Sequence, residues 1–473
     1  MPNDGGIERI LLRLLALPLV GLTLLHADAS AQPARDVLPD VDTIVNSVLR
    51  ATGVPSASVA VVTHGQLAYA RAYGNARISP ATPATPAMRY SIGSISKQFT
   101  SAAVLSLQEQ HLLSLDDPVG RFVTGLTRGN DVTIRQVLSH TSGYQDYWPQ
   151  DYVMPDMKLP VTSQAILDRW ARRPLDFEPG AEWQYSNTNY VIAGLIVEKA
   201  AGMALWQVLS RRFFTPLGMQ SVTNIDERGL PETDAAGYFR YALGPTRPAP
   251  KEGPGWLFAA GELAMTPSDL AKWDISILRQ AVLTPASYLE LGTEVRLKNG
   301  LGTSYGLGVR VAAISGHREL EHSGEVSGYT AENIVLPDDD IAVVVLTNQD
   351  AASAASQIGQ ALTTQVLARN TTVDEPRNAL VKRVFDDLRQ GRIDRSLFTS
   401  NANAYFTEEA LADYAASLGP LGQYESLTPA GVRSRGGMVY RGFTVKFAKK
   451  TVVLSIFEMP DGKFEQFLVE ARD

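Results

Sequence analysis

The sequence of 473 residues contains no cysteine. This absence excludes disulfide bonds, thiolate catalysis and cysteine-bound zinc. It also excludes a lipid anchor attached through a cysteine side chain. A chain of this length can bury enough apolar surface to be stable without covalent cross-links. We therefore expect stability to come from the burial of its hydrophobic residues, which make up 45% of the chain.

Histidine and net positive charge are also scarce. The six histidines show none of the helical spacings at which zinc hydrolases place two metal ligands on one face. Lys and Arg number 43 against 50 Asp and Glu, which gives a formal net charge of −7. A nucleic-acid-binding surface needs the opposite balance. We therefore expect no metal, no other cofactor and no nucleic-acid partner.

A short apolar run near the N-terminus has the features of a secretory signal peptide. Arg9 and Arg13 flank the stretch LLALPLVGLTLL, and the small residues ASA follow at 29–31. We expect residues 1–31 to be removed on export, which predicts a periplasmic or secreted protein without a membrane span. The alternative is an uncleaved membrane anchor, but the apolar run is shorter than the ~20 residues that a transmembrane helix needs.

The order of strand-like and helix-like segments predicts the fold of the first domain. Alternating apolar residues from Pro55 onward flank His64-Gly65 and predict a β-hairpin. Segments within residues 301–350 are again strand-like, and helix-like segments lie between. We expect residues 36–368 to form an α+β domain whose sheet joins both ends of the segment, with helices between them.

The C-terminal part of the chain has its own pattern. A polar, proline-containing stretch at 369–377 is expected to be a linker. Beyond it, residues 378–473 begin with helix-like segments such as ALVKRVFDDLRQG and end with strand-like segments separated by tight turns. This pattern predicts a small C-terminal α+β domain. Residue types typical of catalysis do not cluster there, so its role stays open.

The stretch SIGSISKQFT, residues 91–100, places Lys97 three residues after Ser94 at the start of a helix-like run that is apolar on most sides. Residues at that spacing share one face of a helix. An amine that is partly desolvated can lose its proton and act as a base toward a neighbouring hydroxyl. The alternative is that both side chains mark a solvated helix start.

A second polar group occurs in PGAEWQYSNTNY, where Tyr185, Ser186 and Asn187 are consecutive. A tyrosine hydroxyl can pass a proton between an amine and a leaving group, and an asparagine amide both donates and accepts hydrogen bonds. The alternative is a capping turn before a helix that begins near Tyr190. The same Tyr-x-Asn pattern occurs at residues 73–75, where we expect Gly-Asn to form a turn that closes the first hairpin.

A third group, His322-Ser323-Gly324 followed by Glu325, lies in a strand-like segment. A glycine inside a strand often marks the close approach of a ligand or of another backbone. This strand edge could therefore line a substrate and supply one backbone N–H. The alternative for His322 is an ordinary half-exposed strand histidine. His140, in SHTSGY, is interpreted as a packing residue.

These three groups, in this order and at this spacing, resemble those of the serine β-lactamase and penicillin-binding protein superfamily. The resemblance extends over residues 41–368 and includes the stretches VTIRQVLSHTSGY, EPGAEWQYSNTNYVIAGLIVE and GELAMTPSDLAKW. It points to the class C β-lactamase-like branch, which includes esterases, D-aminopeptidases and D-alanyl-D-alanine carboxypeptidases. The resemblance implies a β-lactamase/transpeptidase-like fold, which is an antiparallel sheet flanked by helices with an inserted all-helical subdomain. This fold agrees with the α+β domain expected above.

The resemblance implies a role for each of the first two groups. Ser94 would be the acylated nucleophile and Lys97 its base. Tyr185 would pass the proton to the leaving group and later help to activate water. Which of Lys97 and Tyr185 is the primary base stays open, as in related enzymes. Asn187 would bind the acyl side chain of the substrate.

For the third group, the resemblance implies contacts with the substrate. His322 takes the place where β-lactamases of the family carry lysine, and Ser323 and Gly324 would line the substrate beside it. The backbone N–H groups of Ser94 and Glu325 would form the oxyanion hole.

The implied function is that of a serine hydrolase that forms an acyl-enzyme on Ser94. It would cleave ester or amide bonds in a small molecule or peptide, such as a D-amino-acid or peptidoglycan-type substrate. Because histidine is mostly uncharged at neutral pH and Glu325 adds a negative charge, we expect neutral or amine-bearing substrates to be preferred over penicillin-type carboxylates. A true β-lactamase and a non-catalytic ligand-binding protein are the alternatives, and the oligomeric state stays open. A nucleophile elbow at GTSYG, residues 302–306, is excluded by the strand-like segment that follows it.

Overall fold

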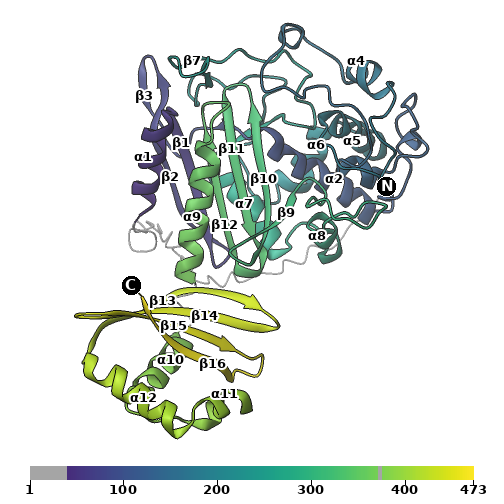
Figure 1. Cartoon of the computed structure of the whole chain (residues 1–473). Coiled ribbons are helices and arrows are strands. Elements are labelled where there is room, and N and C mark those ends of the chain that lie inside the picture. Colours follow the sequence, from purple (N-terminus) through teal and green to yellow (C-terminus); the bar gives the residue numbers. More distant parts are fainter. Residues whose placement is uncertain (1–39, 371–374, 473) are drawn as a thin grey trace, which may run out of the picture.

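The computed structural model describes residues 40–370 and 375–472, so the signal peptide expected at 1–31 lies outside the described residues. Two units follow each other along the chain (Figure 1): a large one built on a seven-stranded sheet and a smaller C-terminal one built on a four-stranded sheet. Both combine helices with antiparallel sheets, which confirms the predicted α+β class.

The large sheet is antiparallel throughout and brings together the two ends of the first unit. β1 is an inner strand that pairs with β2 on one side and with β12 on the other, so that Val59 lies opposite Val345. This pairing confirms that the sheet joins N-terminal and C-terminal segments. The strands follow in the order β3 (Ala81–Pro83), β2 (Gln66–Ile78), β1 (Ser56–Thr63), β12 (Ile341–Thr347), β11 (Tyr329–Leu336), β10 (His317–Val326) and β9 (Arg310–Ile314).

The predicted hairpin is present, but the turn expected after it is not. β1 and β2 are joined by His64-Gly65, whose φ angles of 51° and 63° suit a two-residue hairpin turn. Residues 73–75 do not close the hairpin; they lie inside β2, so the expected turn is wrong. The Tyr73 hydroxyl donates a hydrogen bond to Asp42 at 2.7 Å and takes no part in the site described below.

Helices cover both faces of the large sheet (Figure 1). Successive residues of β12 therefore point into two different cores, Val343 into one and Val344 into the other. All seven residues of this strand are buried, as expected for a strand covered on both faces. The main covering helices are α1 (Val41–Thr52) and α9 (Ala354–Asn370) on one face, and α2 (Ser96–Glu109) and α7 (Pro267–Arg279) on the other.

Helices lie between the strands from the two ends of the unit, as expected, and most of them fall within residues 96–214. α5 (Asn187–Ala201) ends at Gly202, whose φ of 66° suits a helix C-terminus, but it begins three residues before the expected Tyr190. The remaining helices are α3 (Ile134–Leu138), α4 (Ser163–Ile166), α6 (Leu205–Leu209) and α8 (Pro285–Leu291), with π-helical turns at Leu167–Ala171 and Ser210–Phe214. Short strands complete the unit: β4 (Tyr90–Ser91), β5 (Thr223–Asn224), β6 (Tyr238–Phe239), β7 (Arg247–Pro248) and β8 (Leu263–Met265).

α2 is enclosed on all sides, which confirms that its sequence belongs to a buried helix. Every residue from Ser96 to Leu107 is buried, and the apolar ones share a core with α5 and with one face of the large sheet. A helix that is apolar nearly all round suits such a position. Its first turn carries Lys97 into the interior of the protein.

The C-terminal unit has a core of its own, formed between its helices and its sheet. The linker expected at 369–377 overlaps the last residues of α9 and the first residues of the next helix, and residues 371–374 lie outside the described part. The elements are α10 (Glu375–Leu388), α11 (Ser400–Tyr405), α12 (Glu408–Leu418), β13 (Tyr424–Arg435), β14 (Met438–Phe447), β15 (Thr451–Glu458) and β16 (Phe464–Arg472), with the strands adjacent in chain order.

Within residues 40–370 and 375–472, no single helix is both long and apolar enough to cross a membrane. One pair passes the same test of length and composition when taken together, namely α5 and the helical stretch Leu205–Phe214, which are bent by 71° relative to each other.

Candidate active site

Residues from all three predicted groups meet at a cavity of about 310 Å³. Its wall includes Ser94 from the turn before α2, Tyr185 from the segment before α5, Asn187 from the first position of α5, and Glu325 from β10. These segments are far apart in the sequence but adjacent in space. The rest of the wall comes from residues 146–153, Leu257, Ala260, Gly261, Val326, Ser327 and Asp350.

Lys97 is placed as a base for Ser94. Its Nζ contacts three oxygens: Ser94 Oγ at 2.9 Å, Asn187 Oδ1 at 2.8 Å and the Ala260 carbonyl at 2.8 Å. A neutral amine has two N–H groups and one lone pair. The amide and carbonyl oxygens can only accept hydrogen bonds, so they take the two N–H groups. The lone pair is then left for the Ser94 hydroxyl hydrogen, which is the geometry of a nucleophile beside its base.

Burial makes the neutral form of this amine accessible near pH 7. The Lys97 side chain is fully buried. Desolvation lowers its pKa from 10.5 to about 7, and the charge of Asp146 opposes the change. At neutral pH a large fraction of the molecules therefore holds an uncharged base beside Ser94. The alternative of a solvated helix start is wrong.

Tyr185 contacts the same hydroxyl. Burial raises the pKa of its phenol, and a hydrogen bond between its side chain and that of Ser94 acts in the opposite direction. Lys97 Nζ lies 5.0 Å from the centre of the tyrosine ring. A phenol in this position stays protonated at neutral pH and can relay a proton between Ser94 and a leaving group. The structure thus brings the Ser94–Lys97 pair and Tyr185 together.

Asn187 is held between two ionisable groups. Its Oδ1 accepts a hydrogen bond from Lys97, and its Nδ2 donates to Asp146 Oδ2 at 3.3 Å. Its backbone N–H also donates to Asp146, at 2.9 Å. These contacts fix the orientation of the amide and leave one of its N–H groups unused. A contact of that group with the acyl side chain of a substrate stays a prediction.

β10 lies against the turn that carries Ser94. A Cβ added to Gly93 would lie 2.7 Å from the Glu325 backbone nitrogen, and one added to Gly324 would lie 1.9 Å from the Ile92 carbonyl oxygen. Only glycine fits such close approaches. The close approach of another backbone, one of the two possibilities expected for Gly324, is thereby confirmed, because its missing side chain makes room for the Ile92 carbonyl. An oxyanion hole formed by the N–H groups of Ser94 and Glu325 stays a prediction.

Comparison with known proteins decides the family. The sequence profile of the family described as Beta-lactamase matches residues 41–365, which run from α1 into α9 and include every site residue described above.

The chain belongs to the beta-lactamase family.

Curated relatives of this beta-lactamase-family chain include two kinds of protein. It is 29% identical to penicillin-binding protein 4* of Bacillus subtilis over 300 residues, which are 60% of this chain and 66% of the relative. It is 28% identical to a D-aminopeptidase of Brucella anthropi over 298 residues, which are 62% of this chain and 56% of the relative. The match thus spans less than two thirds of the length of these relatives.

Solved structures share the fold. A D-stereospecific amidohydrolase from Streptomyces sp. superposes with a TM-score of 0.58 at 27% identity, over 67% of this chain and 96% of that one. A penicillin-binding protein homologue from Pyrococcus abyssi, described as octameric, superposes with a TM-score of 0.62 at 22% identity. This second likeness covers 92% of this chain and 96% of the other, and it concerns the fold alone.

His322 lies behind the wall of the cavity. Its side chain is buried. The ring Nδ1 donates a hydrogen bond to the Ser323 carbonyl at 2.6 Å, and Nε2 accepts one from the Tyr305 hydroxyl at 2.8 Å. Burial lowers its pKa to about 3, so the ring is neutral. Ser323 is exposed, and it does not line the cavity either. Neither residue lines the cavity, so a contact of either one with the substrate stays a prediction.

Carboxylates dominate the ionisable groups of the cavity wall. Asp146, Asp151, Glu325 and Asp350 line it, and the described lining residues include no lysine, arginine or histidine. Glu325 is exposed, and its Oε1 accepts a hydrogen bond from the Ala351 backbone N–H at 2.8 Å. The negative charge predicted at this rim is thus present, together with three further carboxylates.

Sequence reasoning missed three residues that shape the site. Asp146 lies in the aromatic-rich stretch YQDYWPQDY, whose composition indicates only a loop. Ala260 acts through its backbone carbonyl, for which no side chain gives a signal. His140 was expected only to pack, yet its ring centre lies 4.3 Å from that of Tyr185.

Proposed function

We propose that this protein is a serine hydrolase that cleaves ester or amide bonds through an acyl-enzyme on Ser94. The observation that carries the proposal is the fully buried Lys97, whose Nζ lies 2.9 Å from Ser94 Oγ. Ser94 Oγ would attack the carbonyl carbon while its proton passes to Lys97 or Tyr185. The C–N or C–O bond would then break, with the proton delivered to the leaving group. Water activated by the same groups would release the acid and restore the Ser94 hydroxyl.

The preferred substrates, we propose, carry a positively charged amine or no charge near the scissile bond. Four carboxylates line the cavity. Burial raises the pKa of Asp146 and Asp350, which means that their charged forms are disfavoured by their surroundings. A substrate ammonium group would offset this cost, whereas a substrate carboxylate would increase it. Cleavage of D-amino-acid amides and amine-bearing esters is therefore favoured over hydrolysis of penicillin-type carboxylates.

The relatives support the same choice of substrate. One curated relative is a D-aminopeptidase, and one solved structure of similar fold is a D-stereospecific amidohydrolase. Both names describe hydrolases that act on substrates of D configuration. A β-lactamase or carboxypeptidase activity would need the cavity to accept a carboxylate beside four others, and no basic side chain of the described wall would balance it.

A small substrate panel tests the proposal. D-phenylalanine p-nitroanilide carries a free, charged amine, and its N-acetyl derivative replaces that amine with an uncharged acetamide. A third substrate, p-nitrophenyl butyrate, and a chromogenic cephalosporin complete the set. We expect kcat/KM to be at least about tenfold higher for the free amine than for its acetylated form, equivalent to roughly 1.4 kcal/mol. Equal values for the two anilides, or a preference for the cephalosporin, would contradict the proposed substrate class.

A covalent probe separates an enzyme from a non-catalytic ligand-binding protein. A fluorophosphonate should form one covalent adduct per protein molecule, seen as an increase in the intact mass. Ser94→Ala should prevent this because the nucleophilic oxygen is gone. Absence of the adduct in the wild-type protein, together with no turnover of the panel, would favour the binding protein.

We further propose that the protein is exported, on the strength of the signal-peptide pattern in residues 1–31. Expression of the full chain in a Gram-negative host should yield a periplasmic or secreted product that begins at Gln32. N-terminal sequencing of that product is the test, and a product that retains Met1 in the cytoplasm would contradict it.

A further inference from the structure

His140 takes no part in the proposed reaction, yet it holds the segment that carries Tyr185 at three points. Its carbonyl oxygen accepts a hydrogen bond from the Gln184 N–H at 3.0 Å, and its ring Nδ1 accepts one from the Ser186 N–H at 3.2 Å. Its ring lies against that of Tyr185, with centres 4.3 Å apart and planes inclined by 35°. One residue therefore contacts both chain neighbours of Tyr185 and the tyrosine ring itself.

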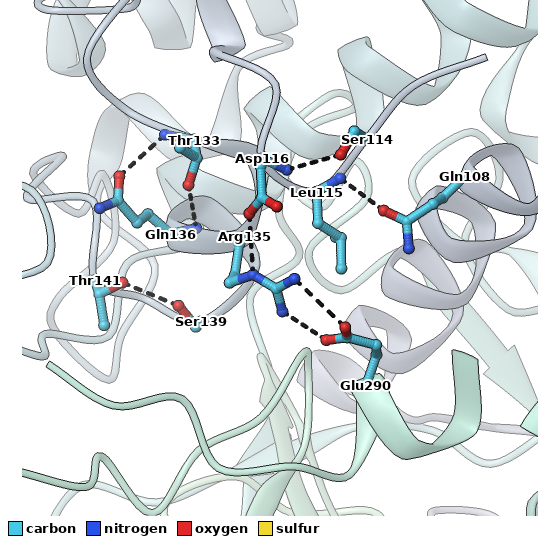
Figure 2. Close-up of polar contacts among 10 residues, drawn as sticks. All are labelled: Gln108, Ser114, Leu115, Asp116, Thr133, Arg135, Gln136, Ser139, Thr141 and Glu290. Carbon is cyan, nitrogen blue, oxygen red and sulfur yellow. Dashed lines mark hydrogen bonds and ion pairs between the residues drawn. The ribbon is translucent and has the colours of Figure 1, made fainter. Parts of the chain in front are cut away.

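The helix that precedes His140 is firmly anchored (Figure 2). α3 begins with a capping box, in which the side chains of Thr133 and Gln136 each accept a hydrogen bond from the backbone N–H of the other. Arg135 then pairs with Glu290 of α8 at 2.6 Å. These contacts fix the helix immediately before His140 to a different part of the chain, and they thereby hold the backbone that leads into the histidine.

The backbone at His140 has a left-handed conformation, with φ of 60°. This region is unfavourable for most side chains and is tolerated best by glycine and asparagine. The hydroxyls of the two chain neighbours, Ser139 and Thr141, lie 3.0 Å apart and bridge the turn (Figure 2). A local strain that the surrounding contacts maintain is typical of positions with a functional constraint.

The ring of His140 is a neutral imidazole that carries its proton on Nε2. A backbone N–H can only donate, so Nδ1, which faces the Ser186 N–H, holds no proton. Asn189 Nδ2 lies 3.4 Å from the same nitrogen. Burial lowers the pKa of the ring well below its ordinary value, and the nearby Lys97 and His322 act in the same direction.

This arrangement leaves the buried Nε2–H group of His140 without a hydrogen-bond partner among the described residues. An apolar ring would fill the same space without leaving a buried donor unsatisfied. What imidazole adds over an apolar side chain is therefore the acceptor at Nδ1, and this acceptor serves the backbone next to Tyr185.

We propose that His140 is a positioning residue, which sets the Tyr185 phenol against Ser94 by fixing the backbone on both sides of it and the plane of its ring. The effect on turnover rests on the proposed function, while the effect on the backbone does not. A displacement of a reacting group by about 1 Å can cost about a hundredfold in rate. Loss of the Nδ1 acceptor should lower kcat and leave KM nearly unchanged, because Tyr185 acts in proton transfer during the reaction and not in substrate binding.

Three variants separate positioning from packing and from backbone strain. His140→Leu fills the space with an apolar side chain but removes the Nδ1 acceptor. His140→Asn places an acceptor near the Nδ1 position and suits the left-handed backbone. His111→Leu is the matched control, because His111 is exposed and has a similar φ of 58°, so it carries the same backbone strain away from the site.

Hydrogen–deuterium exchange tests the backbone contact without any substrate. In His140→Leu, the amide of Ser186 should exchange roughly five to ten times faster, the equivalent of one lost hydrogen bond. His140→Asn and His111→Leu should exchange at the wild-type rate. Unchanged exchange in His140→Leu would overturn the proposal, whatever the protein hydrolyses.

Turnover then tests whether the contact matters for the reaction. On the best substrate of the panel, His140→Leu should lower kcat by about a hundredfold, and His140→Asn should recover most of it. In a Tyr185→Phe background the further loss caused by His140→Leu should nearly vanish, because both changes disable the same group. Fully additive losses would refute positioning. If the wild-type protein shows no turnover that depends on Ser94, the proposed function fails, and the exchange measurement alone decides the role of His140.

Discussion

Replacing Asp146 with asparagine should shift the acidic limb of the pH–rate profile to lower pH. Lys97 must be neutral to accept the Ser94 proton, and burial lowers its pKa to about 7. In the wild-type protein kcat/KM should therefore rise with pH up to about 7 and then level off. The charge of Asp146 favours the protonated amine. Its removal should lower the pKa of Lys97 further, so that the neutral base persists at lower pH.

The size of the shift follows from the geometry of the bridge between the two charges. The Asn187 amide joins them through hydrogen bonds of 2.8 and 3.3 Å. The charges thus lie within about 8 Å of each other, where their attraction is roughly 2 kcal/mol at an effective dielectric constant of about 20. Solvent in the cavity weakens this, and we expect a shift of about one pKa unit. At pH 6 the variant should then retain about half of its plateau rate, and the wild-type protein about a tenth.

The assay should use p-nitrophenyl butyrate, an uncharged ester, so that the lost carboxylate does not alter attraction of the substrate. Asp151→Asn is the matched control, because Asp151 lines the same cavity and makes no hydrogen bond to Asn187. Its acidic limb should stay near pH 7. An Asp146→Asn limb that coincides with the wild-type limb, or moves to higher pH, would refute the assignment of Lys97 as the titrating base.

Three further outcomes are expected. Ser94→Ala should lower kcat by at least about 10⁴-fold with the fold intact, as measured by single-turnover kinetics and circular dichroism; residual activity within tenfold of wild type would contradict the nucleophile. Gly324→Ala should reduce the free energy of unfolding by about 3 kcal/mol in urea titrations, because its Cβ would lie 1.9 Å from a main-chain oxygen. The exposed Gly229→Ala should change it by less than about 0.5 kcal/mol, and equal effects would argue against the close approach. Tyr305→Phe should lower the free energy of unfolding by about 1–3 kcal/mol, since His322 Nε2 loses its buried hydrogen-bond donor. KM should stay unchanged, and a large rise in KM would indicate that His322 contacts the substrate.

The parts of the fold and the site that could be predicted were those set by local spacing. Ser94 and Lys97 lie three residues apart, so any helix that includes them brings their side chains to one face, and the apolar residues that follow indicate burial of that helix. His64-Gly65 supplies the left-handed backbone of a two-residue hairpin turn. In each case one short window contains both partners of the interaction.

The rest depends on contacts between segments that no single window contains. Gly324 in a strand indicates the close approach of either a ligand or another backbone, and only the structure shows that the neighbouring group is the carbonyl of Ile92, far away in the sequence. The sequence correctly predicts that His322 lies in a strand. Only the contact with Tyr305 shows that its ring faces the interior. Ala260 contributes a backbone carbonyl oxygen, which every residue has. Its importance follows only from its contact with Lys97 Nζ in the folded protein.

The place of β1 in the large sheet has a consequence for synthesis of the protein. One edge of this strand finds its partner at once across a two-residue turn, whereas the other must wait for β12, where Ala342 lies opposite Val62. Until nearly the whole domain has left the ribosome, a strand with two apolar faces keeps one edge unpaired. Topologies dominated by such distant partners form slowly and leave nascent molecules prone to aggregation. Chaperones that shield open strand edges should therefore raise the yield of native protein.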